Sequence, residues 1–226
     1  MKLDKIVFVI GVVSSLFIIL ALNTNPKVVR FNKKDKKISK SYKKKESISI
    51  TTVSFISVST PLILFFTVSR ILNIDFEREL EFYISFLTCQ LFMAALVENF
   101  KNICGRLRPD FLDRCRPMRG VCTGNNKVIR EGRRSFPSGH SATAACGFSF
   151  ASLFVGSKFK SSSQNSFLKS KILKGFLLFL CILFPLYVGF TRYIDNRHHI
   201  SDVLGGFLFG IMSSLFFYNF YSKRHI

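Results

Sequence analysis

The sequence predicts an all-α protein folded as a six-helix transmembrane bundle. Two observations favour this fold. Of the 226 residues, 48% are apolar or aromatic. These residues are concentrated in blocks separated by charge-dense linkers, rather than spread at amphipathic spacing. Because lipid offers the backbone no hydrogen-bond partners, a block that spans a bilayer is expected to be a helix.

Six apolar blocks are present, at residues 6–22, 48–67, 82–97, 141–155, 175–190 and 203–221. Each lies at or slightly below the ~20 residues that a membrane helix needs. A single block of this length is typical of a buried helix in a soluble protein, whereas six of them favour an integral membrane bundle. We therefore expect residues 1–226 to form one multi-pass membrane domain.

The first block has an alternative interpretation. A charged start followed by an apolar run also describes a secretory signal peptide. The exit of the block, Ala21-Leu22-Asn23, is a poor cleavage site because it lacks the small-x-small pattern. The sequence therefore favours a retained helix.

The charge is strongly basic, with 33 Lys and Arg against 13 Asp and Glu, or +20. Two segments supply most of it. The basic linker 23–47 has ten basic and two acidic residues, and the loop 101–140 has ten and three. Charge alone is compatible with nucleic-acid binding. An arrangement of apolar residues in blocks is not typical of a soluble nucleic-acid-binding protein, so we expect no nucleic-acid partner.

Two cysteines of the loop, Cys115 and Cys122, are candidates for a disulfide bond. They can pair if the loop faces an oxidising compartment, and they stay free thiols otherwise. The residues leave both outcomes open. No CxxC motif or His/Cys cluster indicates a zinc site.

A first polar segment, residues 101–109, follows the third block directly. Lys101 and Arg108 are seven residues apart, which is two helical turns, so both can face the same side. A Lys provides a point charge and an Arg a planar fork for oxyanions. Glu98, three residues before Lys101, can pair with it on a helix. Cations at a helix end also commonly snorkel to the membrane surface.

A second polar segment, Arg-Ser-Phe-Pro-Ser-Gly-His-Ser at 134–141, precedes the fourth block. Pro137 stiffens the turn, and Gly139 permits close backbone approach. Ser138 can cap the following helix or donate its hydroxyl. Since exposed N–H groups at a helix N-terminus attract phosphate, His140 is expected beside a bound anion.

A third polar segment, residues 191–202, leads into the sixth block. His198 and Asp202 are four residues apart, on one helical face. A carboxylate that orients an imidazole is the arrangement that activates a His, and Arg192 adds another anion fork. Metal binding by His198, His199 and Asp202 is the rival interpretation. Nearby Arg and Lys side chains repel a metal cation, so we expect no metal and no other cofactor.

The order of the blocks predicts that the three polar segments meet. No block separates the first segment from the second, and two blocks separate the second from the third. All three therefore lie on the same membrane face, at the ends of the third, fourth and sixth helices. Cations, two histidines and a carboxylate gathered there indicate a site for a phosphate monoester or a diphosphate.

These segments resemble the motifs of the type 2 phosphatidic acid phosphatase superfamily, which includes the vanadium haloperoxidases. The pattern of that family is K-x6-RP, then PSGH, then SR-x5-H-x3-D. The chain matches it at 101–109, 137–140 and 191–202, with Thr191 in place of the family Ser. Residues 105–115 and 198–203 look like the eukaryotic lipid phosphate phosphatase branch. The resemblance covers residues 47–221 and leaves the basic linker outside.

The resemblance implies catalytic roles for His198, His140 and Asp202, and phosphate binding by Lys101, Arg108, Ser138, Gly139 and Arg192. His198 is expected to attack phosphorus and form a phosphohistidine. Asp202 would orient its ring, and His140 would protonate the leaving alkoxide. Fixed cations would replace a metal ion, with the loop 101–140 as the catalytic loop.

The leading function is that of a metal-independent phosphatase acting on phosphatidic acid and related lipid phosphates. The alternatives are a polyprenyl (dolichyl-type) diphosphate phosphatase and a catalytically silent membrane adaptor. The resemblance places the site on the lumenal or extracellular face. The membrane is expected to be that of the endoplasmic reticulum, another endomembrane or the plasma membrane. The linker 23–47 would share that face, although its ten basic residues favour the cytoplasm by the positive-inside rule.

Overall fold

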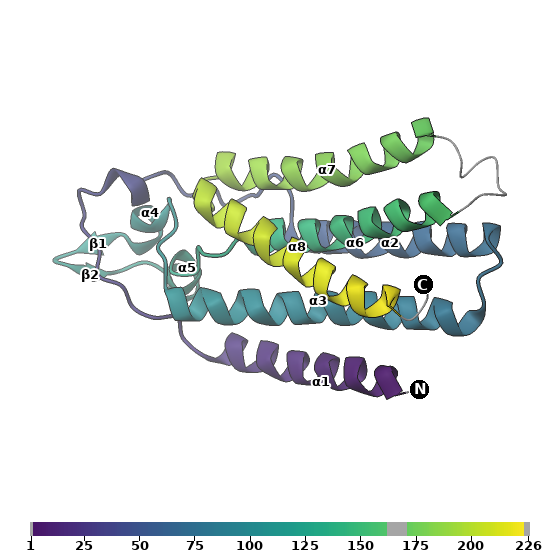
Figure 1. The fold of residues 1–226 in the computed structure, drawn as a ribbon. Coiled ribbons are helices and arrows are strands. Elements are labelled where there is room, and N and C mark those ends of the chain that lie inside the picture. Colours follow the sequence, from purple (N-terminus) through teal and green to yellow (C-terminus); the bar gives the residue numbers. More distant parts are fainter. Residues whose placement is uncertain (1, 162–170, 224–226) are drawn as a thin grey trace.

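Long helices lying side by side form the body of the protein in a computed structural model that describes residues 2–161 and 171–223 (Figure 1). The long helices in these ranges are α1 (Lys2–Asn23), α2 (Ile50–Ile71), α3 (Phe76–Cys104), α6 (Gly139–Ser161), α7 (Lys171–Ile194) and α8 (Ile200–Ser222). Short elements gather at one end of the bundle: η1 (Lys36–Ile38), α4 (Phe111–Cys115), β1 (Pro117–Met118), β2 (Val121–Cys122) and α5 (Asn126–Gly132). The predicted all-α class is confirmed.

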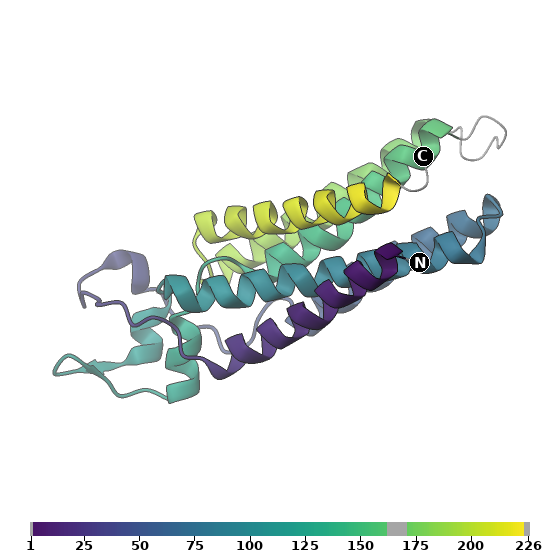
Figure 2. The same ribbon diagram turned by 60° about the horizontal axis from the view of Figure 1, so that its bottom comes forward.

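Five of the described helices, α1, α2, α3, α7 and α8, are long and apolar enough to cross a membrane. They indicate an integral membrane protein. The helix α6 is not among the five, so six membrane crossings remain a prediction. Its position explains its composition, because α6 contacts α2, α3, α7 and α8 and turns little surface toward lipid. By contrast, α1 packs against α3 at the side of the bundle (Figure 2).

Small residues let α6 approach its neighbours closely. A Cβ added to Gly210 of α8 would lie 2.5 Å from the Ala142 carbonyl oxygen of α6. A Cβ added to Gly147 of α6 would lie 2.1 Å from the Ser57 carbonyl oxygen of α2. Such contacts between backbones are how helices associate within lipid, where the hydrophobic effect gives no drive for association. The low hydropathy of α6 therefore follows from its central place.

An aromatic cluster joins four of the helices. Phe65 of α2 stacks on Phe82 of α3 with ring centroids 3.6 Å apart. Phe154 of α6 lies 5.3 Å from Phe82, and Tyr221 of α8 lies 5.4 Å from it. All four side chains are buried. Buried aromatic pairs of this kind stabilise beyond the area they bury, so the cluster holds α2, α3, α6 and α8 in register.

The acidic segment 73–81 belongs largely to α3, which begins at Phe76. Asp75 caps the helix by accepting a hydrogen bond from the Arg78 backbone N–H at 3.0 Å. Glu77 and Glu79 lie in the first turn, where the helix dipole favours carboxylates. Glu79 is buried and pairs with Arg70 of α2. Acidic residues here start the helix rather than interrupt it.

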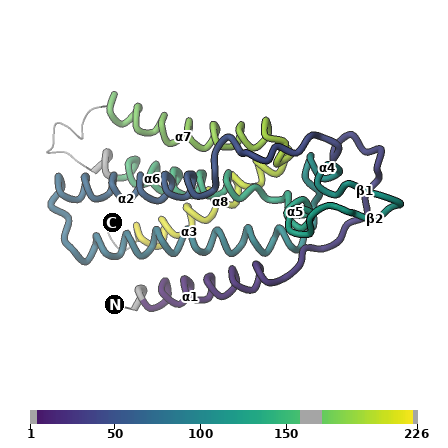
Figure 3. The backbone as a smooth tube through the Cα atoms, turned by 180° about the vertical axis from the view of Figure 1, so that it is seen from behind, coloured from purple at the N-terminus to yellow at the C-terminus, as the bar shows by residue number. Residues whose placement is uncertain are grey.

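The basic linker 23–47 lies over the end of the bundle that holds the loop 101–140 (Figure 3). The Lys27 N–H donates to the Asn102 carbonyl at 2.8 Å, and the Lys40 N–H donates to the Pro109 carbonyl at 2.8 Å. In the same loop Cys115 and Cys122 form a disulfide bond. The three polar segments and the linker therefore share one end of the molecule, as the block order predicts.

Candidate active site

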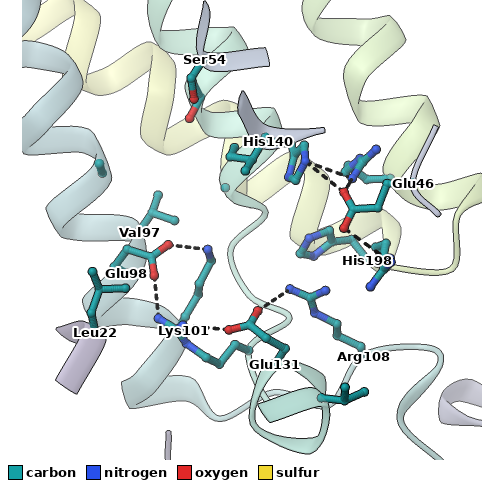
Figure 4. Close-up of a pocket in the computed structure, with 18 of the residues that line it drawn as sticks. Leu22, Glu46, Ser54, Val97, Glu98, Lys101, Arg108, Glu131, His140 and His198 are labelled. Atoms are coloured by element: carbon teal, nitrogen blue, oxygen red, sulfur yellow. Dashed lines mark hydrogen bonds and ion pairs between the residues drawn. The ribbon is translucent and has the colours of Figure 1, made fainter. Parts of the chain in front are cut away.

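A cavity of about 700 Å³ opens at this end of the bundle (Figure 4). Its lining includes six of the eight predicted site residues: Lys101, Arg108, Gly139, His140, Arg192 and His198. The other two, Ser138 and Asp202, are fully buried behind it. The structure thus brings the predicted groups together around one cavity, although some of them are held differently from what the sequence predicts.

Lys101 and Arg108 reach the cavity from different kinds of structure. Lys101 lies in the last turn of α3, which ends at Cys104 with Gly105 in the left-handed conformation at φ 58°. Arg108 is therefore not on the helix, and the expectation of one shared helical face is wrong. Instead, the Arg108 N–H donates to the Gly132 carbonyl at 2.9 Å, which ties the segment to α5.

The Arg108 guanidinium is 8% exposed, and its Nε has no hydrogen-bond partner among the described residues. Burial lowers the pKa of this group to about 10, so it stays protonated at neutral pH. Buried polar groups are normally satisfied. A buried cation with an open donor therefore indicates a place for an anionic ligand.

The N-terminus of α6 lies next to Lys101. A Cβ added to Gly139 would lie 3.0 Å from the Lys101 Nζ, so a larger residue there would push the ammonium aside. Ser138 caps α6, because its Oγ accepts from the Ser141 N–H at 3.4 Å and from the Ser141 hydroxyl at 2.9 Å. Its own N–H donates to the Asp202 carbonyl at 2.9 Å. Of the two roles expected for Ser138, the structure supports capping.

His198 is 3% exposed, and its Nδ1 lies 2.7 Å from the Ser135 carbonyl oxygen. Because a carbonyl oxygen only accepts, Nδ1 carries the ring proton and Nε2 keeps its lone pair. Burial lowers the pKa of His198 to about 3, and the positive charges of Arg108 and Lys101 act in the same direction. The ring is therefore neutral at pH 7 and can act as a nucleophile through Nε2.

Asp202 holds His198 through an intermediary, which corrects the expectation that it orients the ring directly. The nearest Asp202 oxygen lies 3.9 Å from the His198 Nδ1, beyond hydrogen-bond range. That oxygen accepts from the Ser135 hydroxyl at 2.6 Å and from the His199 N–H at 2.8 Å. Asp202 thus fixes Ser135, whose carbonyl fixes the ring. Asp202 also caps the first turn of α8, and this cap draws its carboxylate toward the backbone.

Arg192 lies at the centre of a dense hydrogen-bond network and is fully buried. Its Nη1 donates to Glu46 Oε2 at 2.6 Å and lies 3.1 Å from His140 Nε2. Its Nη2 donates to the Ile48 carbonyl at 2.9 Å and to Asp195 Oδ2 at 3.2 Å. The linker 23–47 and Ile48, two residues before α2, therefore supply acceptors for this cation.

Each predicted phosphate-binding cation is paired with a glutamate. The pairs are Lys101–Glu98 at 2.5 Å, Arg108–Glu131 at 3.4 Å and Arg192–Glu46 at 2.6 Å. The first is the pair that the spacing on α3 predicts. Glu46 and Glu131 are not among the site residues predicted from the sequence. In the sequence, each is an isolated acidic residue within a basic segment, and this local feature could have marked it as a site residue.

Both missed glutamates are ionised. Burial raises the pKa of Glu46, but hydrogen bonds from His140 and Arg192 outweigh burial and hold the pKa well below its ordinary value. Burial also raises the pKa of Glu131, but the positive charges of Arg108 and Arg134 outweigh burial and lower the pKa. The cavity therefore combines cations with fixed carboxylates, and its net field depends on both.

The cavity also has an apolar wall. Ile50 at the start of α2 and Met93, Ala94 and Val97 of α3 line it. Met93 lies eight residues before Lys101, or about 12 Å along the helix at 1.5 Å per residue. One cavity therefore combines a cationic end with a wall that leads toward the interior of the bundle.

Comparison with known proteins identifies relatives of the chain. The sequence profile of the PAP2 superfamily matches residues 82–226. Lipid phosphate phosphatase 2 of Arabidopsis thaliana is 33% identical over 138 residues, which are 57% of this chain and 46% of that protein. Diacylglycerol pyrophosphate phosphatase 1 of Saccharomyces cerevisiae is 34% identical over 140 residues, 56% of this chain and 47% of that protein.

A human relative, phospholipid phosphatase 2, is 35% identical over 130 residues, which are 52% of this chain and 43% of that protein. The chain thus spans about half the length of these curated relatives. No solved structure matches the chain.

Proposed function

Because the chain belongs to the PAP2 superfamily, we propose that it hydrolyses lipid phosphate monoesters such as phosphatidic acid. One observation supports the proposal: a single cavity is lined by the three predicted phosphate-binding cations Lys101, Arg108 and Arg192, by two histidines and by an apolar wall. The cations suit a phosphate dianion, and the wall suits the first part of an acyl chain. The names of the relatives, which include lipid phosphate phosphatases, support the same substrate class.

The first step is attack by the His198 Nε2 lone pair on phosphorus. A nitrogen–phosphorus bond forms as the bond to the ester oxygen breaks, which leaves a phosphohistidine and a diacylglycerol alkoxide. His140, which also lines the cavity, donates a proton from its protonated form to that alkoxide and becomes neutral. The Ser135 carbonyl, held by Asp202, keeps the attacking nitrogen free of hydrogen.

The second step is hydrolysis of the phosphohistidine. His140, now neutral, accepts a proton from water as the water oxygen attacks phosphorus. The nitrogen–phosphorus bond breaks, which restores neutral His198 and releases inorganic phosphate. Lys101, Arg108 and Arg192 stabilise the charge on the phosphoryl oxygens in both steps. Since these cations supply that stabilisation, activity is expected to persist in EDTA.

The site faces the lumenal or extracellular side in this proposal. The Cys115–Cys122 disulfide lies at the same end of the bundle as the cavity, and disulfides persist in oxidising compartments. The disulfide therefore indicates the opposite orientation to the basic charge of the linker 23–47, which favours the cytoplasm. Protease protection of that linker in sealed vesicles tests the orientation.

The decisive test is phosphate release from phosphatidic acid by the purified protein and by His198→Ala. The variant is expected to lose activity by about three orders of magnitude or more, because no other group replaces the nucleophile. Glu77→Gln, at the opposite end of α3, is the matched control. Substantial activity left in His198→Ala would exclude His198 as the nucleophile. A preference for polyprenyl diphosphates in the same assay would contradict the monoester proposal.

A further inference from the structure

The carboxylate of Glu46 makes the contacts that a phosphoryl group needs. Its Oε2 accepts from Arg192 Nη1 at 2.6 Å and lies 3.3 Å from His140 Nε2. Its Oε1 lies 3.5 Å from Arg197 Nη2. Arg192 and His140 are two of the groups that the proposed mechanism directs at the substrate. A carboxylate and a phosphoryl oxygen carry similar charge and accept the same hydrogen bonds.

Each N–H of Arg192 faces a protein atom in this arrangement, and those of Nη1 face Glu46 and His140 Nε2. Its Nη2 is taken by Ile48 and Asp195, and its Nε donates to the Thr191 hydroxyl at 3.2 Å. A phosphoryl oxygen can therefore reach Arg192 only if one acceptor leaves. Glu46 is the acceptor that can move most easily, because its side chain is 29% exposed and it lies outside regular secondary structure.

Asp195, the competing carboxylate, is fixed. Its side chain is 2% exposed, and it accepts from the Ser47 N–H at 2.8 Å and from the Ser47 hydroxyl at 2.7 Å. The other two site glutamates are also held in place, because the buried Arg134 bridges Glu98 at 2.6 Å and Glu131 at 3.1 Å. Glu131 is more exposed than Glu46, at 45% against 29%, but it lies in α5 and is held by Arg134, whereas Glu46 lies on the linker outside regular secondary structure.

Arg197 offers the displaced carboxylate a further hydrogen-bond donor. Its guanidinium already lies 3.5 Å from Glu46, and its buried Nε has no hydrogen-bond partner among the described residues. A rotation of the Glu46 side chain toward this donor would exchange one cation for another. The carboxylate would then stay paired while Arg192 and His140 become available.

We propose, on the basis of the proposed function, that Glu46 is an internal competitor of the substrate phosphate. Its carboxylate occupies the place of a phosphoryl oxygen at Arg192 and His140, and it moves to Arg197 when a phosphate binds. The competition weakens binding of every phosphate ligand at this site, including the product.

The test compares wild type, Glu46→Gln and Glu46→Ala, with Glu77→Gln as the matched control on an exposed helix start. The probe is inorganic phosphate, measured by titration calorimetry on the purified full chain. Both Glu46 variants are expected to bind phosphate about tenfold more tightly, the scale of one removed charge repulsion at a partly exposed site. Glu77→Gln is expected to match wild type.

Kinetics on phosphatidic acid separate competition from a positioning role. A competitor predicts a lower KM in Glu46→Gln with kcat retained. A carboxylate that instead positions His140 predicts a lower kcat at unchanged KM, and that result would overturn the proposal. Equal phosphate affinity in wild type and both variants would overturn it as well. If none of these proteins binds phosphate, the proposed function fails too.

Discussion

All ten basic side chains of the linker 23–47 are exposed, whereas the loop 101–140 buries Arg108, Arg114 and Arg134. The two segments have nearly the same net charge, from ten basic and two acidic residues in the linker and ten and three in the loop. Similar composition therefore has different structural consequences at the same end of one molecule.

The linker reaches the site through acceptors as well as through two cations: Lys44 lines the cavity, and the Nζ of Lys43 lies 4.0 Å from Asp195 Oδ1. Its Glu46 carboxylate pairs with Arg192, and its Lys43 carbonyl accepts from Arg197 at 2.6 Å. The loop acts through buried guanidinium groups, which need such partners to be stable. The net charge of a segment therefore does not determine which groups of that segment reach the site.

The largest expected effect comes from a buried cation of the loop. Arg114 makes two hydrogen bonds to the fully buried Asp110, at 2.7 and 2.8 Å. Arg114→Met leaves that carboxylate unpaired and should cost about 3–5 kcal/mol of stability. Thermal unfolding in detergent measures the loss, with Lys37→Met of the linker as control. Equal unfolding temperatures for the two variants would abolish the contrast between the segments.

A slightly smaller effect is expected on catalysis. Arg108→Ala removes a buried donor from the proposed phosphate site and should lower kcat/KM by about 10²–10³, as for the loss of one preorganised donor. Lys36→Ala in the linker should leave kcat/KM unchanged. Phosphate release from phosphatidic acid measures both. A similar loss in the two variants would mean that overall positive charge, and not placement, supports activity.

The pH response of His198 is the third test. Burial and the loop cations lower the pKa of His198 from 6.5 to about 3. As the pH falls, the unfolded state therefore binds this proton near pH 6.5, and the folded state binds it only near pH 3. Stability linked to His198 is therefore full above pH 6.5 and is lost as the pH falls from there toward 3. Histidine NMR should find a neutral ring at pH 5, with its signal assigned by His198→Ala. A charged ring at pH 5 would contradict the assigned environment.

The smallest effect is expected from the exposed lysines. Replacing Lys33, Lys34, Lys36 and Lys37 together by Gln removes four positive charges that lie outside the cavity lining. Solvent screens such charges, so kcat should change less than twofold. Binding to vesicles that contain anionic lipid should weaken, since a lysine near such a surface contributes about 1 kcal/mol. A large fall in kcat would place these side chains in the mechanism.

The sequence predicts the parts of this protein that depend on local pattern. Apolar blocks indicate the long helices because the backbone must satisfy itself in lipid. The block order places the three polar segments at one end, and six of their eight predicted site residues line one cavity. Even the Lys101–Glu98 pair follows from the spacing along one helix.

Tertiary structure alone decided how those groups are held. The Ser135 carbonyl that binds His198 is 63 residues away in the chain, and Glu46 is 146 residues from Arg192. No periodicity links such positions, because a contact between distant segments depends on how the helices and loops pack. The sequence determined which chemical groups are available, and packing determined that a carbonyl orients the nucleophile while a linker glutamate occupies the anion site.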